Sequence, residues 1–211
     1  MLSDVDARIQ RTHRQKIQKL RGKTVVILSD ARQMGRSTAA LLTSEGAQVV
    51  LAARSEVELS GALAAAAREG FEIEGQVVEG AISSDVKRFF EKAQARFGRI
   101  DAVVSFIALE NGPDEDQEMR QLLFTQEAIP YLKTGECGQM IHVGQGQYKS
   151  RAASWDALSE RSMVAAMRRQ ARELGIRVTL IEPGMEADGM LNADDVARSI
   201  SGSLEQNFNA T

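Results

Sequence analysis

Short apolar runs alternate with longer amphipathic patterns along most of this chain, and this alternation restricts the fold more than any other feature of the sequence. Six runs of strand length lie at 24–28, 48–53, 72–78, 102–108, 139–143 and 177–181. Six patterns of helical period lie at 35–44, 56–68, 85–97, 116–132, 155–174 and 193–204. Strands that alternate with helices pair in parallel through right-handed crossovers, which put helices on both faces of the sheet. The sequence therefore predicts an α/β fold with a doubly wound, mostly parallel six-stranded sheet.

The composition is that of a globular protein. The chain has 211 residues, of which 43% are hydrophobic and 26% are charged, and its net charge is -3. It has no run of about 18 apolar residues, and its basic N-terminus lacks the apolar core of a secretory signal. We therefore expect a cytoplasmic protein that binds neither a membrane nor nucleic acid.

Cysteine and histidine are scarce. The single cysteine, Cys137, excludes an internal disulfide and a cysteine-cluster metal site, and the only histidines are His13 and His142. We therefore expect no metal site. His142 lies in the middle of an apolar run, which favours a core or interface histidine over a catalytic base.

The first 21 residues predict an extension to the domain. Val5, Ile9, Ile17 and Leu20 fall near helical spacing among many basic residues. This pattern indicates an amphipathic helix over 1–21 that lies on the body of the protein or on a partner subunit. Residues 22–211 are then a single domain.

Several short fragments appear in a fixed order along the predicted elements. They are Leu20-x-Gly-Lys, Gly35-Arg-Ser-Thr-Ala, Val49-Val-Leu-Ala-Ala-Arg54, Arg96-Phe-Gly-Arg-Ile-Asp101, Ala128-Ile-Pro130, Gly175-Ile-Arg-Val178 and Glu182-Pro-Gly184. In this order and spacing the chain resembles the short-chain dehydrogenase/reductase family over roughly residues 20–200. The resemblance implies a Rossmann-like sheet, an NAD(P)-dependent oxidoreductase ancestry, and a homo-oligomer paired through the helices at 116–132 and 155–174.

The turn after the first strand is the place where such a fold binds a dinucleotide. Three glycines serve there: one makes the tight turn, one admits the pyrophosphate, and one packs the helix on the strand. Alignment on Gly35 puts Ser29 and Gln33 at the first two positions, so only the packing glycine is present. The amides from Met34 onward still offer an anion the positive end of a helix. We expect weakened phosphate binding, with the Gln33 side chain in the way unless it turns aside.

Two arginines indicate which dinucleotide would bind. By the resemblance, Arg32 stands where NADP-preferring relatives carry a basic residue, and Arg54 ends the second strand. An NAD-specific chain would show an acidic residue one place earlier, at Ala53. We therefore expect NADP if a dinucleotide binds, and weak or absent binding overall.

The family's reductase chemistry has no matching residues in this chain. The resemblance implies a proton-donating Tyr with a Lys four residues later on one helix face, together with a Ser and an Asn. The only tyrosines are Tyr131 and Tyr148, and neither has a Lys four residues later. The family's Tyr, Lys, Ser and Asn positions fall at 155–157, at Glu160 or Arg161, at Gln145 and at Gln117. The resemblance therefore assigns no catalytic residue.

We interpret the chain as a divergent short-chain dehydrogenase/reductase-like protein that acts as a binding or interaction module. The alternative is an NADP-dependent oxidoreductase with a rearranged site, in which Tyr148 beside Lys149 donates the proton and Arg32 and Arg54 hold NADP. A third reading is a subunit of a larger complex that docks through the basic N-terminal helix.

Overall fold

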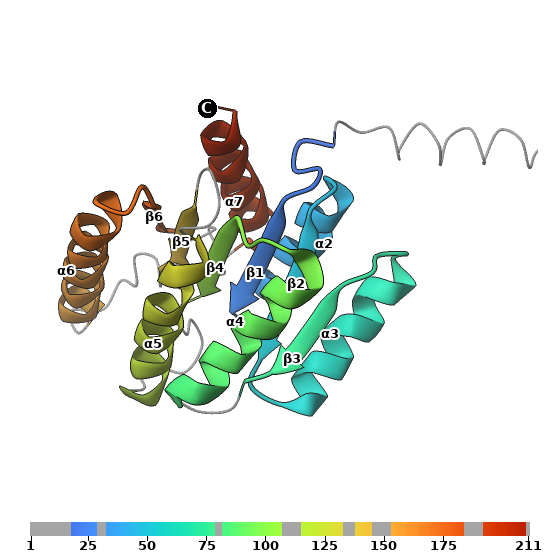
Figure 1. The fold of residues 1–211 in the computed structure, drawn as a ribbon, viewed down its shortest axis with the longest axis horizontal. Coiled ribbons are helices and arrows are strands. Elements are labelled where there is room, and N and C mark those ends of the chain that lie inside the picture. Colours follow the sequence, from blue (N-terminus) through green and yellow to red (C-terminus); the bar gives the residue numbers. More distant parts are fainter. Residues whose placement is uncertain are drawn as a thin grey trace, which may run out of the picture.

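The computed structural model covers residues 1–211 and describes residues 18–28, 33–78, 82–106, 115–132, 138–144, 153–183 and 192–209. Within these ranges the side chains of residues 115–121, 153–161 and 163 are outside the description. The described residues form one six-stranded sheet (Figure 1). Its strands are β1 (Thr24–Leu28), β2 (Gln48–Ala53), β3 (Glu74–Val77), β4 (Ala102–Phe106), β5 (Gln139–Val143) and β6 (Arg177–Ile181).

The strand order is β3-β2-β1-β4-β5-β6, and every neighbouring pair is parallel. This is the order of a doubly wound Rossmann sheet, in which the chain moves outward from β1 in one direction and then in the other. The predicted fold class is therefore confirmed.

Six described helices connect or follow the strands. They are α2 (Gln33–Ser44), α3 (Glu56–Arg68), α4 (Ser83–Phe97), α5 (Glu115–Leu132), α6 (Ala153–Arg172) and α7 (Ala193–Phe208). Two buried clusters divide them between the faces of the sheet: α2, α3 and α7 contribute to one, and α4, α5 and α6 to the other. Figure 1 shows the sheet between these two groups.

The strand β1 shows why helices must cover both faces of the sheet. All five of its residues are buried. Alternate side chains of a strand point to opposite faces, so Val25 and Ile27 pack on the side of α2 and α7, while Val26 packs on the side of α4 and α5. A strand that is buried at every position needs both faces of the sheet covered.

Four aromatic rings join α4 to α5 over the sheet. Phe90 lies 5.4 Å from Phe89, 4.8 Å from Phe124 and 5.3 Å from Tyr131, measured between ring centroids. The three phenylalanines are at most 1% exposed. These contacts fix the height of α5 above the sheet.

The phenylalanine cluster makes a testable contribution to stability. Phe124→Ala removes a fully buried ring, so we expect the free energy of unfolding to fall by about 3–5 kcal/mol in urea titrations. The matched control is Val57→Ala, because Val57 is 82% exposed and its truncation should change stability by less than about 0.5 kcal/mol. Equal effects of the two variants would contradict this account of the core.

Candidate functional site

The carboxyl ends of β1, β2 and β4 define the edge at which a ligand would bind. In doubly wound sheets, ligands bind where the strand order reverses, and here that point lies between β1 and its neighbour β4. The edge includes the start of α2, which follows β1, and the turn from β2 into α3. Ser29 and Arg32 lie outside the described residues, so their predicted roles stay predictions.

The start of α2 meets the requirements for binding an anion. The first amides of a helix have no acceptor within it and carry the positive end of the helix dipole. The first turn of α2 has no acidic residue that would oppose an anion. Gly35 is buried and Met34 packs against the core, which leaves Gln33 and Arg36 as the exposed side chains of this turn.

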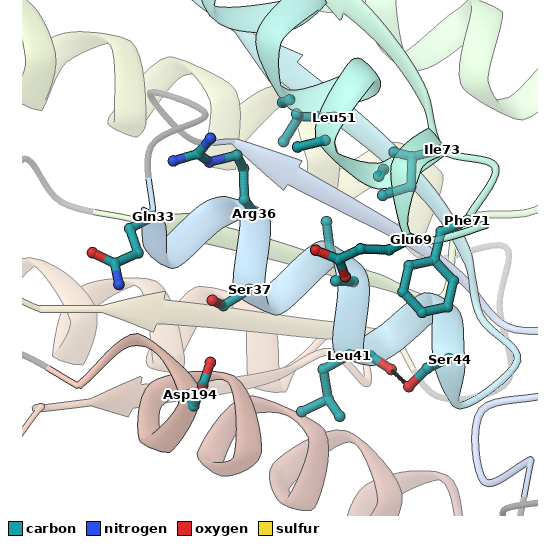
Figure 2. Close-up of a pocket in the computed structure, with 15 residues that line it drawn as sticks. Gln33, Arg36, Ser37, Leu41, Ser44, Leu51, Glu69, Phe71, Ile73 and Asp194 are labelled. Carbon is teal, nitrogen blue, oxygen red and sulfur yellow. Dashed lines mark hydrogen bonds between the residues drawn. The ribbon is translucent and has the colours of Figure 1, made fainter. Parts of the chain in front are cut away.

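The position of Gln33 bears on the expectation that it obstructs a pyrophosphate. Its side chain lines a cavity along the flank of α2, together with Arg36 and Ser37 (Figure 2). The packing role expected for Gly35 fits its burial between α2 and the sheet.

Arg54 follows the last residue of β2 and sits beside the first turn of α3. The Nη2 atom of Arg54 lies 3.7 Å from Glu58 Oε1, and the Arg54 side chain is 31% exposed. Ser55 caps α3 by accepting a hydrogen bond from the amide of Glu58 at 3.3 Å. Because β1 and β2 are parallel neighbours, Arg54 and residues 33–35 belong to the same edge of the sheet.

A buried pair that the sequence did not predict lies just below this edge. Ser105 Oγ lies 2.7 Å from His142 Nδ1, and each residue is 1% exposed. The two residues are direct partners in the register of β4 and β5. The sequence gives only one indication of this pair: Ser105 is the fourth of the five residues of β4, and His142 is the fourth of the five residues of β5. The interpretation of His142 as a core histidine is confirmed.

The environment of His142 keeps its imidazole neutral. Burial, followed by the positive charge of Arg168, lowers the pKa of His142 from its ordinary value of 6.5 to about 4. Arg168 is held nearby on α6 by a hydrogen bond of 3.0 Å from its Nε to the carbonyl of Val178. At neutral pH the Ser105–His142 pair is therefore an uncharged hydrogen bond inside the sheet.

Tyr131 is not placed for catalysis at the ligand edge. It lies one residue before the end of α5, where a Cβ added to Gly138 would lie 2.6 Å from the carbonyl oxygen of Leu132. Since Gly138 immediately precedes β5, Tyr131 belongs to the amino end of the sheet. Burial, with the nearby Glu91 and Glu127, raises the pKa of Tyr131, which disfavours proton donation further.

The other residues considered for catalysis fall outside what the structure describes. Gln145, Tyr148 and Lys149 are not among the described residues, and only the backbone is described for Gln117 and for residues 155–161. Within the described ranges, no group of three or more His, Cys, Asp or Glu side chains is placed to hold a metal ion. The helices of the described part include none that is both long and apolar enough to cross a bilayer.

Comparison with known proteins identifies the family. The family model for short chain dehydrogenases matches residues 23–127, and the chain belongs to the short-chain dehydrogenase/reductase family. Tropinone reductase-like 3 from Erythroxylum coca is 24% identical over 199 residues, which are 85% of this chain and 77% of the relative. An uncharacterized oxidoreductase of Staphylococcus saprophyticus is 26% identical over 195 residues, covering 83% and 82% of the two chains.

Solved structures agree on the fold. A metagenomic short-chain oxidoreductase in complex with NADP superposes with a TM-score of 0.73 at 21% identity, covering 89% of this chain and 92% of the other. A short chain dehydrogenase from Mycobacterium smegmatis gives a TM-score of 0.72 at 21% identity, covering 86% and 85%. The Rossmann-like architecture expected from the sequence is thus shared with known oxidoreductases.

The lowered pKa of His142 predicts a pH dependence of stability. Above about pH 6.5 the histidine is neutral in both states, but between 6.5 and about 4 the unfolded chain binds a proton that the folded chain does not. Stability should therefore fall over this window, by roughly 3 kcal/mol in total from this group. His142→Asn should flatten the curve of unfolding free energy against pH.

The control for this experiment is His13→Asn, which removes the only other histidine. It should leave the pH dependence as it is in the unaltered chain. If His142→Asn and the unaltered chain lose the same stability between pH 6.5 and 4, the buried histidine does not titrate as described.

Proposed function

We propose that this chain is a divergent short-chain dehydrogenase/reductase that binds NADP(H) weakly at the carboxyl edge of its sheet and acts as a binding or interaction module. The observation that carries this proposal is that the chain keeps features of the family's cofactor-binding edge but lacks its catalytic residues. The binding edge keeps groups that suit phosphates, whereas the chain has two tyrosines and neither has a lysine four residues later.

The residues at this edge fit a dinucleotide in part. The amides at the start of α2 would face the pyrophosphate, and the first turn of α2 brings no acidic side chain. Ser29 and Gln33 replace two glycines of the usual turn. Ser29 stands at the glycine of the tight turn, and Gln33 adds a side chain where the family's backbone approaches the pyrophosphate, so affinity should be lower than in a relative with all three glycines.

Arg54 would select NADP over NAD. It occupies the end of β2, where the ribose of the adenosine half lies in Rossmann folds, and a guanidinium there pairs with a 2′-phosphate. Its contact with Glu58 is 3.7 Å long, which leaves most of its donors available. Arg32 would add a second cation.

When bound, NADPH supplies hydride chemistry, and the chain's own contribution would be the proton. Tyr131 faces the aromatic cluster at the opposite end of the sheet. The Ser105–His142 pair is buried and neutral, so it orients the ends of β4 and β5 without exchanging protons with solvent. These residues support a module that binds the dinucleotide and lacks the family's usual turnover.

The second candidate function is an NADP-dependent oxidoreductase with a rearranged site. The names of the relatives favour it, because both the Erythroxylum protein and the Staphylococcus protein are described as reductases or oxidoreductases. Tyr148 would donate the proton, and the adjacent Lys149 would lower its pKa by charge proximity. In either reading the chain would form a homo-oligomer through α5 and α6, the long helices that the resemblance assigns to pairing.

Calorimetric titration with NADP and NAD tests the binding half of the proposal. NADP should bind more tightly than NAD, and Arg54→Ala should weaken NADP binding by about tenfold while leaving NAD binding unchanged. Arg68→Ala is the control, because Arg68 is an exposed arginine in the last turn of α3, the helix that follows Arg54. Equal loss in both variants, or no NADP binding at all, would overturn this assignment.

Activity assays with NADPH and a panel of carbonyl substrates test the second half. We expect no turnover above the rate of the protein-free mixture. Turnover that is lost in Tyr148→Phe would establish the rearranged oxidoreductase instead. Turnover that survives in this variant would contradict both readings of the proton donor.

A further inference from the structure

Two described helices begin beside the central strands of the ligand edge, and their first turns differ in charge. The first turn of α2 has no acidic residue, whereas the first turn of α3 has Glu56 and Glu58. The α3 turn follows Arg54, the residue that would pair with a 2′-phosphate. Residues 54–58 contain one arginine and two glutamates, so this short stretch has more negative than positive charge. A phosphate bound here would be attracted by one side chain and repelled by others.

The cap of α3 holds Glu58 beside Arg54. Ser55 Oγ accepts a hydrogen bond from the amide of Glu58 at 3.3 Å, which fixes the backbone of Glu58 in the first turn. From there the side chain reaches toward Arg54, and Glu58 Oε1 lies 3.7 Å from Arg54 Nη2. The Glu58 side chain is only 25% exposed. Water and salt therefore screen its charge less than they would screen a fully exposed carboxylate.

The second oxygen of the Glu58 carboxylate is a buried acceptor without a donor. Glu58 Oε2 accepts no hydrogen bond within the described part of the chain. The contact of Oε1 with Arg54 is itself longer than a hydrogen bond. A buried acceptor that stays unpaired lowers stability, so a ligand that can donate to it is favoured over one that cannot. A ribose hydroxyl can donate, whereas a phosphate monoester is mostly deprotonated at neutral pH.

We infer that Glu58 is a specificity-determining residue of the dinucleotide site and that it reduces the preference for NADP that Arg54 creates. This inference rests on the proposed function, because it requires the adenosine ribose of a dinucleotide at the end of β2. A 2′-phosphate that pairs with Arg54 comes close to the Glu58 carboxylate, and the two negative charges repel each other. NAD has a hydroxyl at the same place and meets no such repulsion.

This role gives the site a second cause of weak NADP binding. The first cause is the altered phosphate turn, which acts on the pyrophosphate and therefore weakens NADP and NAD alike. Glu58 acts at the ribose, where the two dinucleotides differ, so its effect falls on NADP alone. The ratio of the two affinities separates these causes, because only the second changes it.

A purely structural role of Glu58 predicts a different outcome. Carboxylates in the first turn of a helix stabilise it by offsetting the helix dipole, and Glu56 has the same place in this respect as Glu58. Glu56 is exposed, and the described ion pair of Arg54 is with Glu58. If the two glutamates only stabilised α3, their replacement would have equal effects on binding.

Calorimetric titration of the full-length chain with NADP and with NAD tests the inference. Glu58→Gln removes the charge and nearly keeps the shape of the side chain. We expect this variant to bind NADP about tenfold more tightly than the unaltered chain, because the repulsion at the 2′-phosphate is gone. Its affinity for NAD should change by less than about threefold.

The matched control is Glu56→Gln, which removes the same charge from an exposed residue of the same turn. It should change the NADP affinity by less than about threefold. Salt supplies a second readout, since about 1 M salt shortens the screening length to about 3 Å. The advantage of Glu58→Gln over the unaltered chain should shrink at high salt, which a change of shape alone would not produce.

Three results would overturn the role of Glu58. They are an unchanged NADP affinity in Glu58→Gln, a weaker one, which would mean that Glu58 orients Arg54 for the phosphate, and an equal gain in Glu56→Gln. If these occur while Arg54→Ala still weakens NADP binding, the proposed NADP site stands and only the role of Glu58 fails. If neither the unaltered chain nor Glu58→Gln binds NADP, the proposed function fails and this inference fails with it.

Discussion

The pairing of β1 with β2 on one side and with β4 on the other is the constraint from which the rest of the molecule follows. Because the chain moves outward from β1 in both directions, α2 and α4 must cover opposite faces of the sheet. The buried carboxylate of Asp101 reinforces this centre: it accepts the amide of Thr24 at 2.9 Å and pairs with Arg99 at 2.5 Å. The ligand edge is a consequence of this arrangement, since the loops after β1 and β4 diverge there.

The sequence predicted the bounds of four strands, each of which contains a mostly apolar run. The bounds of β1, β2, β5 and β6 agree with the expected ranges, because a continuous apolar run ends sharply at polar or turn residues. The strand β3 is shorter than the expected range 72–78: it is the edge strand, half of whose pairing partners are missing, and only Glu74–Val77 pairs with β2. The last helix is longer than the expected range 193–204, because Glu205 bonds to Lys19 and Asn207 to Gln139.

The candidate site could be predicted only in outline. The position of Arg54 follows from the end of β2, and the burial of Gly35 follows from the need to pack α2 on the sheet. The orientation of Gln33 could not be predicted, because it depends on how the elements around the start of α2 pack in three dimensions. The Ser105–His142 pair depends on strand register, which places two residues opposite each other that are 37 positions apart. Periodicity within a single strand carries no information about such a partner.

The helix α2 links the three features discussed above. Its buried residues pack on the sheet and on α7, its first turn presents amides without an acceptor inside the helix to the ligand edge, and its outer flank lines a cavity together with residues of α3. Of the three glycine positions of the usual phosphate turn, Ser29 and Gln33 occupy two, and only Gly35, inside α2, is a glycine. Gly35, the glycine that lets the helix pack closely on the strand, is present and buried, so the position of α2 against the sheet is kept while the turn that receives the pyrophosphate is altered.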